Sequence, residues 1–168
     1  MSVTDEVLHA DEAYARDFKL GNLPMPPARK LAILACMDAR ITVEQVCGLR
    51  TGDAHIIRNA GGIATDDALR SFIISHHLLG TQEFIVINHT DCGMLTFKDD
   101  ELKAQIEADT GIRPAFALEA FADAEKDVVQ SLARIAASVF IPHKDHVRGF
   151  VYDVRSGRLR EVNALVAA

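Results

Sequence analysis

The stretch that decides the fold is KLAILAC at residues 30–36, an apolar run of strand length that ends on a cysteine. Two similar runs follow, at Ala54–Arg58 and at Glu83–Asn88. Between them, residues 66–79 carry apolar side chains at helical spacing and are followed by Gly80, a residue typical of helix ends. Continuous apolar strands that alternate with helices predict an α/β fold in which a mostly parallel central sheet is flanked by helices.

The rest of the chain extends this pattern without dividing it. The sequence shows no internal repeat, no low-complexity segment and no linker that would separate two domains. We therefore expect one domain over residues 1–168, in which residues 1–27 form an N-terminal helical arm and a linker. The further elements that we expect are helices at 4–19, 99–107 and 119–137 and a terminal hairpin of strands at 147–154 and 159–162.

The composition excludes several function classes. The net charge is −6 and the basic residues are scattered, whereas nucleic-acid binding requires a clustered basic face. The N-terminus is acidic and polar, unlike a signal peptide, and no apolar run approaches the roughly 18 residues of a membrane span. Three cysteines without a disulfide framework are typical of a reducing compartment. We expect a cytoplasmic protein that binds neither nucleic acid nor a membrane.

Side chains that bind metals follow the first and third predicted strands. Cys36 ends the first strand, and His89 and Cys92 come after the third. Ligands of such a sheet bind beyond the carboxyl ends of its strands, so we expect these three side chains to meet. Two thiolates and one imidazole are typical zinc ligands, and they leave one position of a tetrahedral site open. Asp38 is the nearest spare carboxylate, so either water or Asp38 fills the fourth position.

The two motifs resemble the signature of the beta-class carbonic anhydrases, which is Cys-x-Asp-x-Arg after the first strand and His-x-x-Cys after a later one. All five signature positions match, at Cys36, Asp38, Arg40, His89 and Cys92. The stretch RNAG at 58–61 is similar to the family's Arg-Asn-x-Gly, and the resemblance extends over about residues 31–153. It implies one Zn²⁺ per subunit on the two cysteines and the histidine. Asp38 and Arg40 are then a catalytic carboxylate and guanidinium pair beside the metal.

The resemblance also implies how the protein assembles and what it does. Members of the family are homodimers or dimers of dimers, with the N-terminal helix packed on a partner subunit and active sites near the dimer interface. The implied activity is hydration of carbon dioxide to bicarbonate by attack of zinc-bound hydroxide, the reaction of a carbonate dehydratase, which is a lyase. Two thiolates weaken zinc as a Lewis acid, so we expect activity to rise on the alkaline side. If Arg40 releases Asp38, the carboxylate becomes the fourth zinc ligand and switches the enzyme off.

A second activity fits the same residues. HTDCGML, from residue 89, resembles a compact subgroup of the family that includes carbonyl sulfide hydrolases, which release hydrogen sulfide and carbon dioxide. Carbonyl sulfide is a linear heterocumulene like carbon dioxide, so the shape of the pocket decides between the two substrates. We assign Ala39, Gly61 and Gly62 to this substrate pocket.

The remaining candidate residues have less specific interpretations. A non-catalytic structural zinc site is an alternative, although Arg40 would have no purpose beside it. Cys47 is interpreted as a small buried hydrophobe, and Asp91 as a hydrogen-bonding or solvated loop residue. Five further histidines are interpreted as structural or solvated rather than as proton shuttles, at positions 55, 76, 77, 143 and 146.

Overall fold

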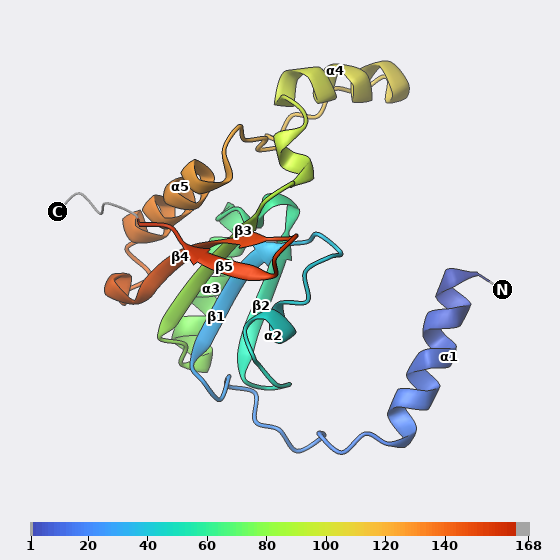
Figure 1. Cartoon of the computed structure of the whole chain (residues 1–168), viewed down its shortest axis with the longest axis vertical. Helices are drawn as coiled ribbons and strands as arrows, with labels where there is room; N and C mark the ends of the chain where they lie inside the picture. Colours follow the sequence, from blue (N-terminus) through green and yellow to red (C-terminus); the bar gives the residue numbers. More distant parts are fainter. Residues whose placement is uncertain (1, 164–168) are drawn as a thin grey trace.

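The computed structural model of this chain describes residues 2–163 (Figure 1). Both ends of the expected domain, residue 1 and residues 164–168, lie outside the described residues. The helices are α1 (Val3–Arg16), α2 (Val43–Val46), α3 (Asp66–Leu79), α4 (Asp99–Thr110) and α5 (Ala124–Ala137). The strands are β1 (Leu31–Cys36), β2 (Ala54–Asn59), β3 (Glu83–His89), β4 (Val147–Asp153) and β5 (Arg158–Glu161). Three short 3₁₀ turns are η1 (Ala60–Gly62), η2 (Gly93–Leu95) and η3 (Lys144–His146).

The strands form one sheet in the order β2-β1-β3-β4-β5. All neighbouring pairs are parallel except β4 and β5, which form the antiparallel hairpin expected at the end of the chain. From β1 the chain first moves outward to β2 and then returns to place β3 on the other side of β1. The carboxyl ends of β1 and β3 therefore lie side by side at the point where the strand order reverses, which is the usual ligand-binding position in such sheets.

Each face of the sheet buries one apolar cluster. The long helices α3 and α5 both cover the same face (Figure 1). On that face, Phe72 of α3 packs edge-on against Phe84 of β3 with ring centroids 5.0 Å apart. The opposite face is covered by the short helix α2 and by loops, with Ile41 and Met94 packed near Ile33. The sheet is therefore mostly parallel and flanked by helices, as the alternation of strands and helices predicts.

One helix begins later than its apolar pattern predicts. The expected helix at 119–137 starts at Ala124, because Asp123 caps it by accepting bonds from the backbone N–H groups of the next turn. Glu119 lies before this cap in the left-handed region, with φ of 64°. Its backbone N–H and those of its two neighbours donate to the carboxylate of Asp99, so this segment folds onto the start of α4 instead of into α5.

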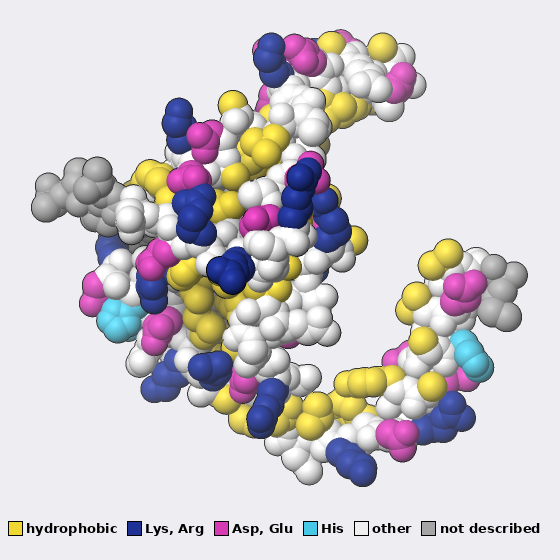
Figure 2. Space-filling model, in the orientation of Figure 1, with side chains coloured by type: hydrophobic (Ala, Val, Ile, Leu, Met, Phe, Trp, Pro, Cys, Tyr) yellow, Lys and Arg dark blue, Asp and Glu magenta, His cyan; other side chains and the backbone are white. Residues whose placement is uncertain are grey.

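Helix α1 lies apart from the sheet (Figure 1). Ser2 and Asp5 form a capping box at its start, yet the helix buries no residue. Val7, Leu8 and Tyr14 of this helix are exposed. Figure 2 shows apolar side chains lying open along the arm. Among residues 2–163, no helix has both the length and the apolar character needed to cross a bilayer.

Candidate metal centre and catalytic pair

Three side chains that bind metals converge at the carboxyl edge of the sheet. Cys36 is the last residue of β1, His89 is the last residue of β3, and Cys92 lies immediately before η2. All three are buried, and their ligand atoms lie within 4.8 Å of one another. The two Sγ atoms are 3.9 Å apart. Within residues 2–163, this is the group of His, Cys, Asp and Glu side chains that converges closely enough to hold a metal ion.

The ring of His89 is oriented with one nitrogen aimed at the thiols. Its Nδ1–H donates to the carbonyl oxygen of Thr90 at 2.8 Å, which leaves the lone pair on Nε2. Nε2 is buried and has no hydrogen-bond partner in the structure. An unpartnered buried nitrogen is costly, and metal-binding histidines commonly donate their other ring N–H to a carbonyl in this way. The orientation of His89 therefore fits a metal ligand.

Hydrogen bonding polarises the thiols even without an ion. The hydrogen bond with Cys92 lowers the pKa of Cys36 to about 4 despite burial, and the nearby ring of His89 contributes to the same shift. The same interaction with Cys36, together with burial, raises the pKa of Cys92. Burial opposes a charge on His89, but its contacts with the Cys36 thiolate outweigh this and raise its pKa. Metals bind cysteine as the thiolate, so the lowered pKa of Cys36 favours binding of a cation at this group.

Asp38 and Arg40 form a two-bond ion pair beside this group. Arg40 donates from Nε to Oδ1 of Asp38 at 2.9 Å and from Nη2 to Oδ2 at 2.8 Å. The backbone N–H of Arg40 also donates to Oδ1. These bonds hold the pKa of Asp38 well below its usual range, so the carboxylate is ionised and only accepts hydrogen bonds. Its Oδ2 lies 3.7 Å from Nε2 of His89, so it faces the metal-binding atoms.

Arg40 also contacts the loop that connects His89 to Cys92 after β3. Its Nη1 donates to Oδ2 of Asp91 at 2.9 Å, and its Nη2 donates to the backbone carbonyl of Asp91 at 2.9 Å. Asp91 has φ of 56°, a left-handed conformation that Asp tolerates better than most residues. The sequence places Asp91 between His89 and Cys92 but gives no indication that it binds Arg40.

A second arginine fixes the backbone of the loop after β1. Arg58 of β2 donates from Nε and Nη2 to the carbonyl oxygen of Cys36 at 3.0 and 2.9 Å. Its Nη2 also donates to the carbonyl oxygen of Asp38 at 2.7 Å. Arg58 thereby holds both ends of the segment that joins Cys36 to Asp38.

The residues assigned to the substrate pocket occupy three different environments. Gly62 is buried with φ of 72°, and a Cβ there would lie 2.7 Å from the carbonyl oxygen of Ile87 and 2.8 Å from the nitrogen of Cys36. Gly62 therefore packs against the backbone of β1 and β3, next to Cys36. A Cβ on Gly61 would meet Ile63 and an aromatic ring, whereas Ala39 is exposed.

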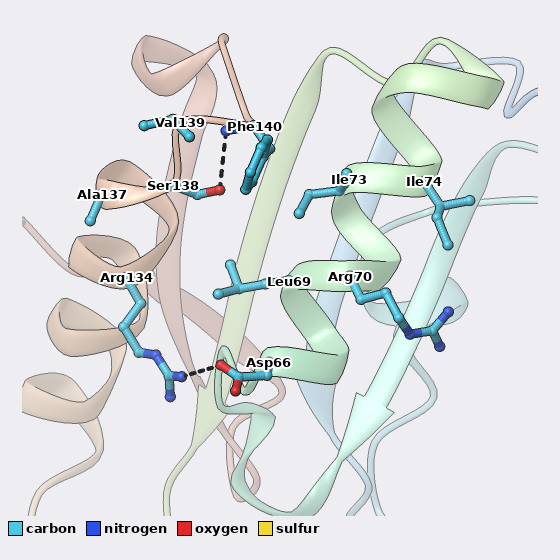
Figure 3. Close-up of a pocket in the computed structure, with 10 residues that line it drawn as sticks. All are labelled: Asp66, Leu69, Arg70, Ile73, Ile74, Arg134, Ala137, Ser138, Val139 and Phe140. Carbon is cyan, nitrogen blue, oxygen red and sulfur yellow. Dashed lines mark hydrogen bonds and ion pairs between the residues drawn. The ribbon is translucent and has the colours of Figure 1, made fainter.

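A groove elsewhere on the molecule does not include these residues. It has a volume of about 650 Å³ and lies between α3 and the end of α5 (Figure 3). Its wall is mostly apolar, and Asp66 and Arg134 form an ion pair at 2.9 Å across its rim (Figure 3). Because it contains no metal-binding cluster, the centre at the carboxyl edge of the sheet remains the candidate site.

Comparison with known proteins agrees with this geometry. Residues 31–159 match the family described as carbonic anhydrase. A protein of Mycobacterium tuberculosis named beta-carbonic anhydrase 1 is 52% identical over 162 residues, which cover 96% of this chain and 99% of that protein. The chain belongs to the beta-carbonic anhydrase family. This membership confirms the resemblance to the family that the two motifs predicted.

Two further relatives have names that refer to different substrates. The crystal structure of a carbonic anhydrase from Streptococcus mutans is 41% identical, with a TM-score of 0.92 over 97% of this chain and 99% of that one. A protein of Saccharolobus solfataricus named carbon disulfide hydrolase is 37% identical over 181 residues, covering 91% of this chain and 88% of that protein. The beta-carbonic anhydrase fold is therefore shared by proteins named for two different substrates.

Proposed function

We propose that this chain is a zinc enzyme that hydrates carbon dioxide to bicarbonate. The observation that carries the proposal is the ionised Asp38, held by Arg40 and facing a group of two thiols and one unpartnered imidazole nitrogen. Two sulfurs at about 2.3 Å from a tetrahedral zinc ion lie about 3.8 Å apart. The 3.9 Å between the Sγ atoms of Cys36 and Cys92 fits that geometry.

The roles of the residues follow from their positions. Zinc, when held by Cys36, His89 and Cys92, supplies Lewis-acid activation of water. Asp38 is ionised, so its Oδ2 accepts a hydrogen from the reacting water and directs the oxygen lone pair at the carbon of the substrate. Arg40 keeps Asp38 ionised and oriented. If the carboxylate left Arg40, Asp38 would be available as a fourth ligand for a metal held by the other three residues, in place of water.

The same proposal includes assembly as a cytoplasmic homodimer or a dimer of dimers. The side chains of Arg40 and of its neighbour Asp91 are 47% and 67% exposed, so this side of the site opens onto the surface of the single chain. Helix α1 presents apolar side chains without burying any of them. A second copy that receives α1 would cover these surfaces.

Replacement of Asp38 tests the catalytic role. Asp38→Asn keeps the size of the side chain but removes the charge, so we expect carbon dioxide hydration to fall by about 10² to 10⁴-fold while zinc content is unchanged. The matched control is Asp66→Asn, which also breaks an Asp–Arg pair but lies away from the metal group. Equal activity in Asp38→Asn and the natural protein, measured by stopped-flow proton release, would contradict the assigned role.

Hydrolysis of carbonyl sulfide is the second candidate, and the carbon disulfide hydrolases among the relatives favour it. Carbon disulfide and carbonyl sulfide are linear molecules with an electrophilic central carbon, like carbon dioxide. Sulfide release from both sulfur compounds should be measured beside carbon dioxide hydration on the same zinc-loaded preparation. Fast hydration with trace sulfide release supports the first proposal, and the opposite ratio supports the second. Bound zinc with neither activity would favour a non-catalytic zinc-binding protein.

A further inference from the structure

The guanidinium of Arg40 is shared between two carboxylates. The carboxylate of Asp38 accepts hydrogen bonds from Nε and Nη2 of Arg40. The carboxylate of Asp91 accepts one from Nη1, and the backbone carbonyl of Asp91 accepts one from Nη2. The two acidic residues come from different loops, one after β1 and the other after β3. Arg40 therefore ties these loops together, and each of its neighbours restricts how it can turn.

The hydrogen bonds between Arg40 and Asp91 depend on the backbone conformation of Asp91. With φ of 56°, Asp91 turns its own carbonyl and its carboxylate toward the same guanidinium. Arg40 is nearly half exposed, so few packing contacts would fix its rotamer without these bonds. Hydrogen bonds rather than burial therefore fix the side-chain conformation of Arg40.

The ion pair with Arg40 also holds Asp38 away from the metal group. Oδ2 of Asp38 already lies 3.7 Å from Nε2 of His89, so a small rotation is enough to bring it among the metal ligands. The two bonds from the Arg40 side chain oppose that rotation. Whatever stabilises Arg40 in this rotamer lowers the fraction of time for which Asp38 is free.

We propose that Asp91 is a positioning residue, which holds Arg40 against Asp38 and so limits the release of Asp38 toward the metal. The proposal deepens the proposed function and rests on it, because release matters only if a metal occupies the three ligands. The carboxylate and the backbone carbonyl of Asp91 accept hydrogen bonds from Arg40. Asp91 acts through Arg40.

Hydrogen exchange of the Arg40 Nε–H gives a direct test. This hydrogen exchanges with solvent only while it is not bonded to Asp38, so its rate is proportional to the population of the released state. Nitrogen-15 NMR of zinc-loaded protein would measure it in the natural chain and in Asp91→Gly, because glycine tolerates the positive φ. Loss of a largely exposed ion pair predicts an exchange rate about twofold to fivefold faster.

Two further variants separate this role from a general loosening of the loop. Asp91→Asn keeps an acceptor for Nη1 and tolerates the backbone conformation, so we expect it to restore most of the protection. Glu119→Gly is the matched control, because Glu119 is also an acidic residue at positive φ beside an arginine, Arg134, at 3.7 Å. We expect the control to leave exchange at Arg40 unchanged.

The outcomes distinguish this proposal from the proposed function. An unchanged exchange rate in Asp91→Gly, an equal increase in Glu119→Gly, or loss of zinc from Asp91→Gly would each overturn the positioning role. The natural protein reports separately on the proposed function, through its zinc content and its hydration of carbon dioxide. A natural chain that binds zinc but hydrates nothing would overturn the proposed function, while the exchange rates would still decide the role of Asp91. A chain that binds no zinc would overturn both.

Discussion

The side chains at the carboxyl edge of the sheet are buried, whereas nearly all residues of the N-terminal arm, residues 2–27, are exposed. At the edge, Cys36, His89 and Cys92 are each less than 5% exposed. In the arm, residues 2–26 are exposed throughout and Pro27 is the first buried residue. Both regions nevertheless contain many apolar side chains. The difference teaches that the site is organised within one chain, whereas helix α1 of the arm buries none of its residues against its own chain.

The local sequence of the arm stabilises its helix only modestly. Helix α1 has 14 residues and a capping box, but isolated helices of about 12 to 15 residues are marginal in water. Helices of that length in proteins usually depend on burial of an apolar face. Four predictions, ordered from the largest expected effect to the smallest, concern the metal group, the arm and the packing of the sheet.

Removal of one ligand should abolish metal binding. His89→Ala or Cys92→Ser leaves two protein ligands, so we expect zinc content to fall from one ion per chain to none, measured by atomic absorption after gel filtration. Cys47→Ser is the matched control, because Cys47 is a half-buried thiol outside the metal group. Zinc retained at one ion per chain in His89→Ala would show that another set of residues binds the metal.

Removal of the arm should disrupt assembly but preserve the fold. Deletion of residues 1–27 removes exposed apolar side chains and one buried residue, Pro27, so we expect a folded monomer in analytical ultracentrifugation. The shortened chain should keep its zinc, because all three ligands lie beyond the deletion. A shortened chain that remains dimeric would contradict the role of α1 in assembly, and one that unfolds would contradict the independence of the sheet.

A methyl group at position 62 should strain the backbone of the strands next to Cys36. The Cβ of Gly62→Ala would meet backbone atoms of Ile87 and Cys36 at under 3 Å in a left-handed residue. We expect unfolding in urea to show a loss of about 3 kcal/mol, from overpacking and backbone strain together. Gly80→Ala is the control, since φ is 74° but nothing lies within 4 Å, so about 1 kcal/mol is expected. Equal losses would show that the close approach next to Cys36 has little energetic weight.

The buried carboxylate of Asp127 should give a small pH dependence. Burial raises its pKa, and it accepts a hydrogen bond from Nδ2 of Asn88 at 2.8 Å. The folded state therefore binds more protons than the unfolded state between the two pKa values, so stability falls as pH rises through that window and is constant above it. Asp127→Asn keeps an acceptor and removes this charge.

Relative to the natural chain, Asp127→Asn should become more stable as pH rises from 4 to 8, by no more than about 1 kcal/mol. Urea unfolding at several pH values measures the difference. Asp109→Asn, an exposed position on α4, is the control and should not change the pH dependence. A natural chain whose stability rises across this window as steeply as the variant's would contradict the assigned effect of Asp127.

Much of the architecture was readable from the sequence because it depends on local patterns. The apolar run before Cys36 and the run before His89 predict strands, and the rule for parallel sheets then places both residues at one edge. The five signature positions identify the family. The start of α5 was predicted five residues too early, because the apolar spacing does not reveal that Asp99 binds the backbone around Glu119.

Contacts between distant side chains were decided only by the tertiary structure. The sequence determined that Asp38 and Arg40 lie two positions apart and that Asp91 lies between two ligands. It did not determine that Arg40 binds both carboxylates, that Arg58 holds the loop after β1, or that α3 and α5 share one face of the sheet. The physical reason is that periodicity and motif spacing fix local conformation, whereas the direction of a side chain depends on the backbone dihedral angles and neighbours that exist only in the folded chain.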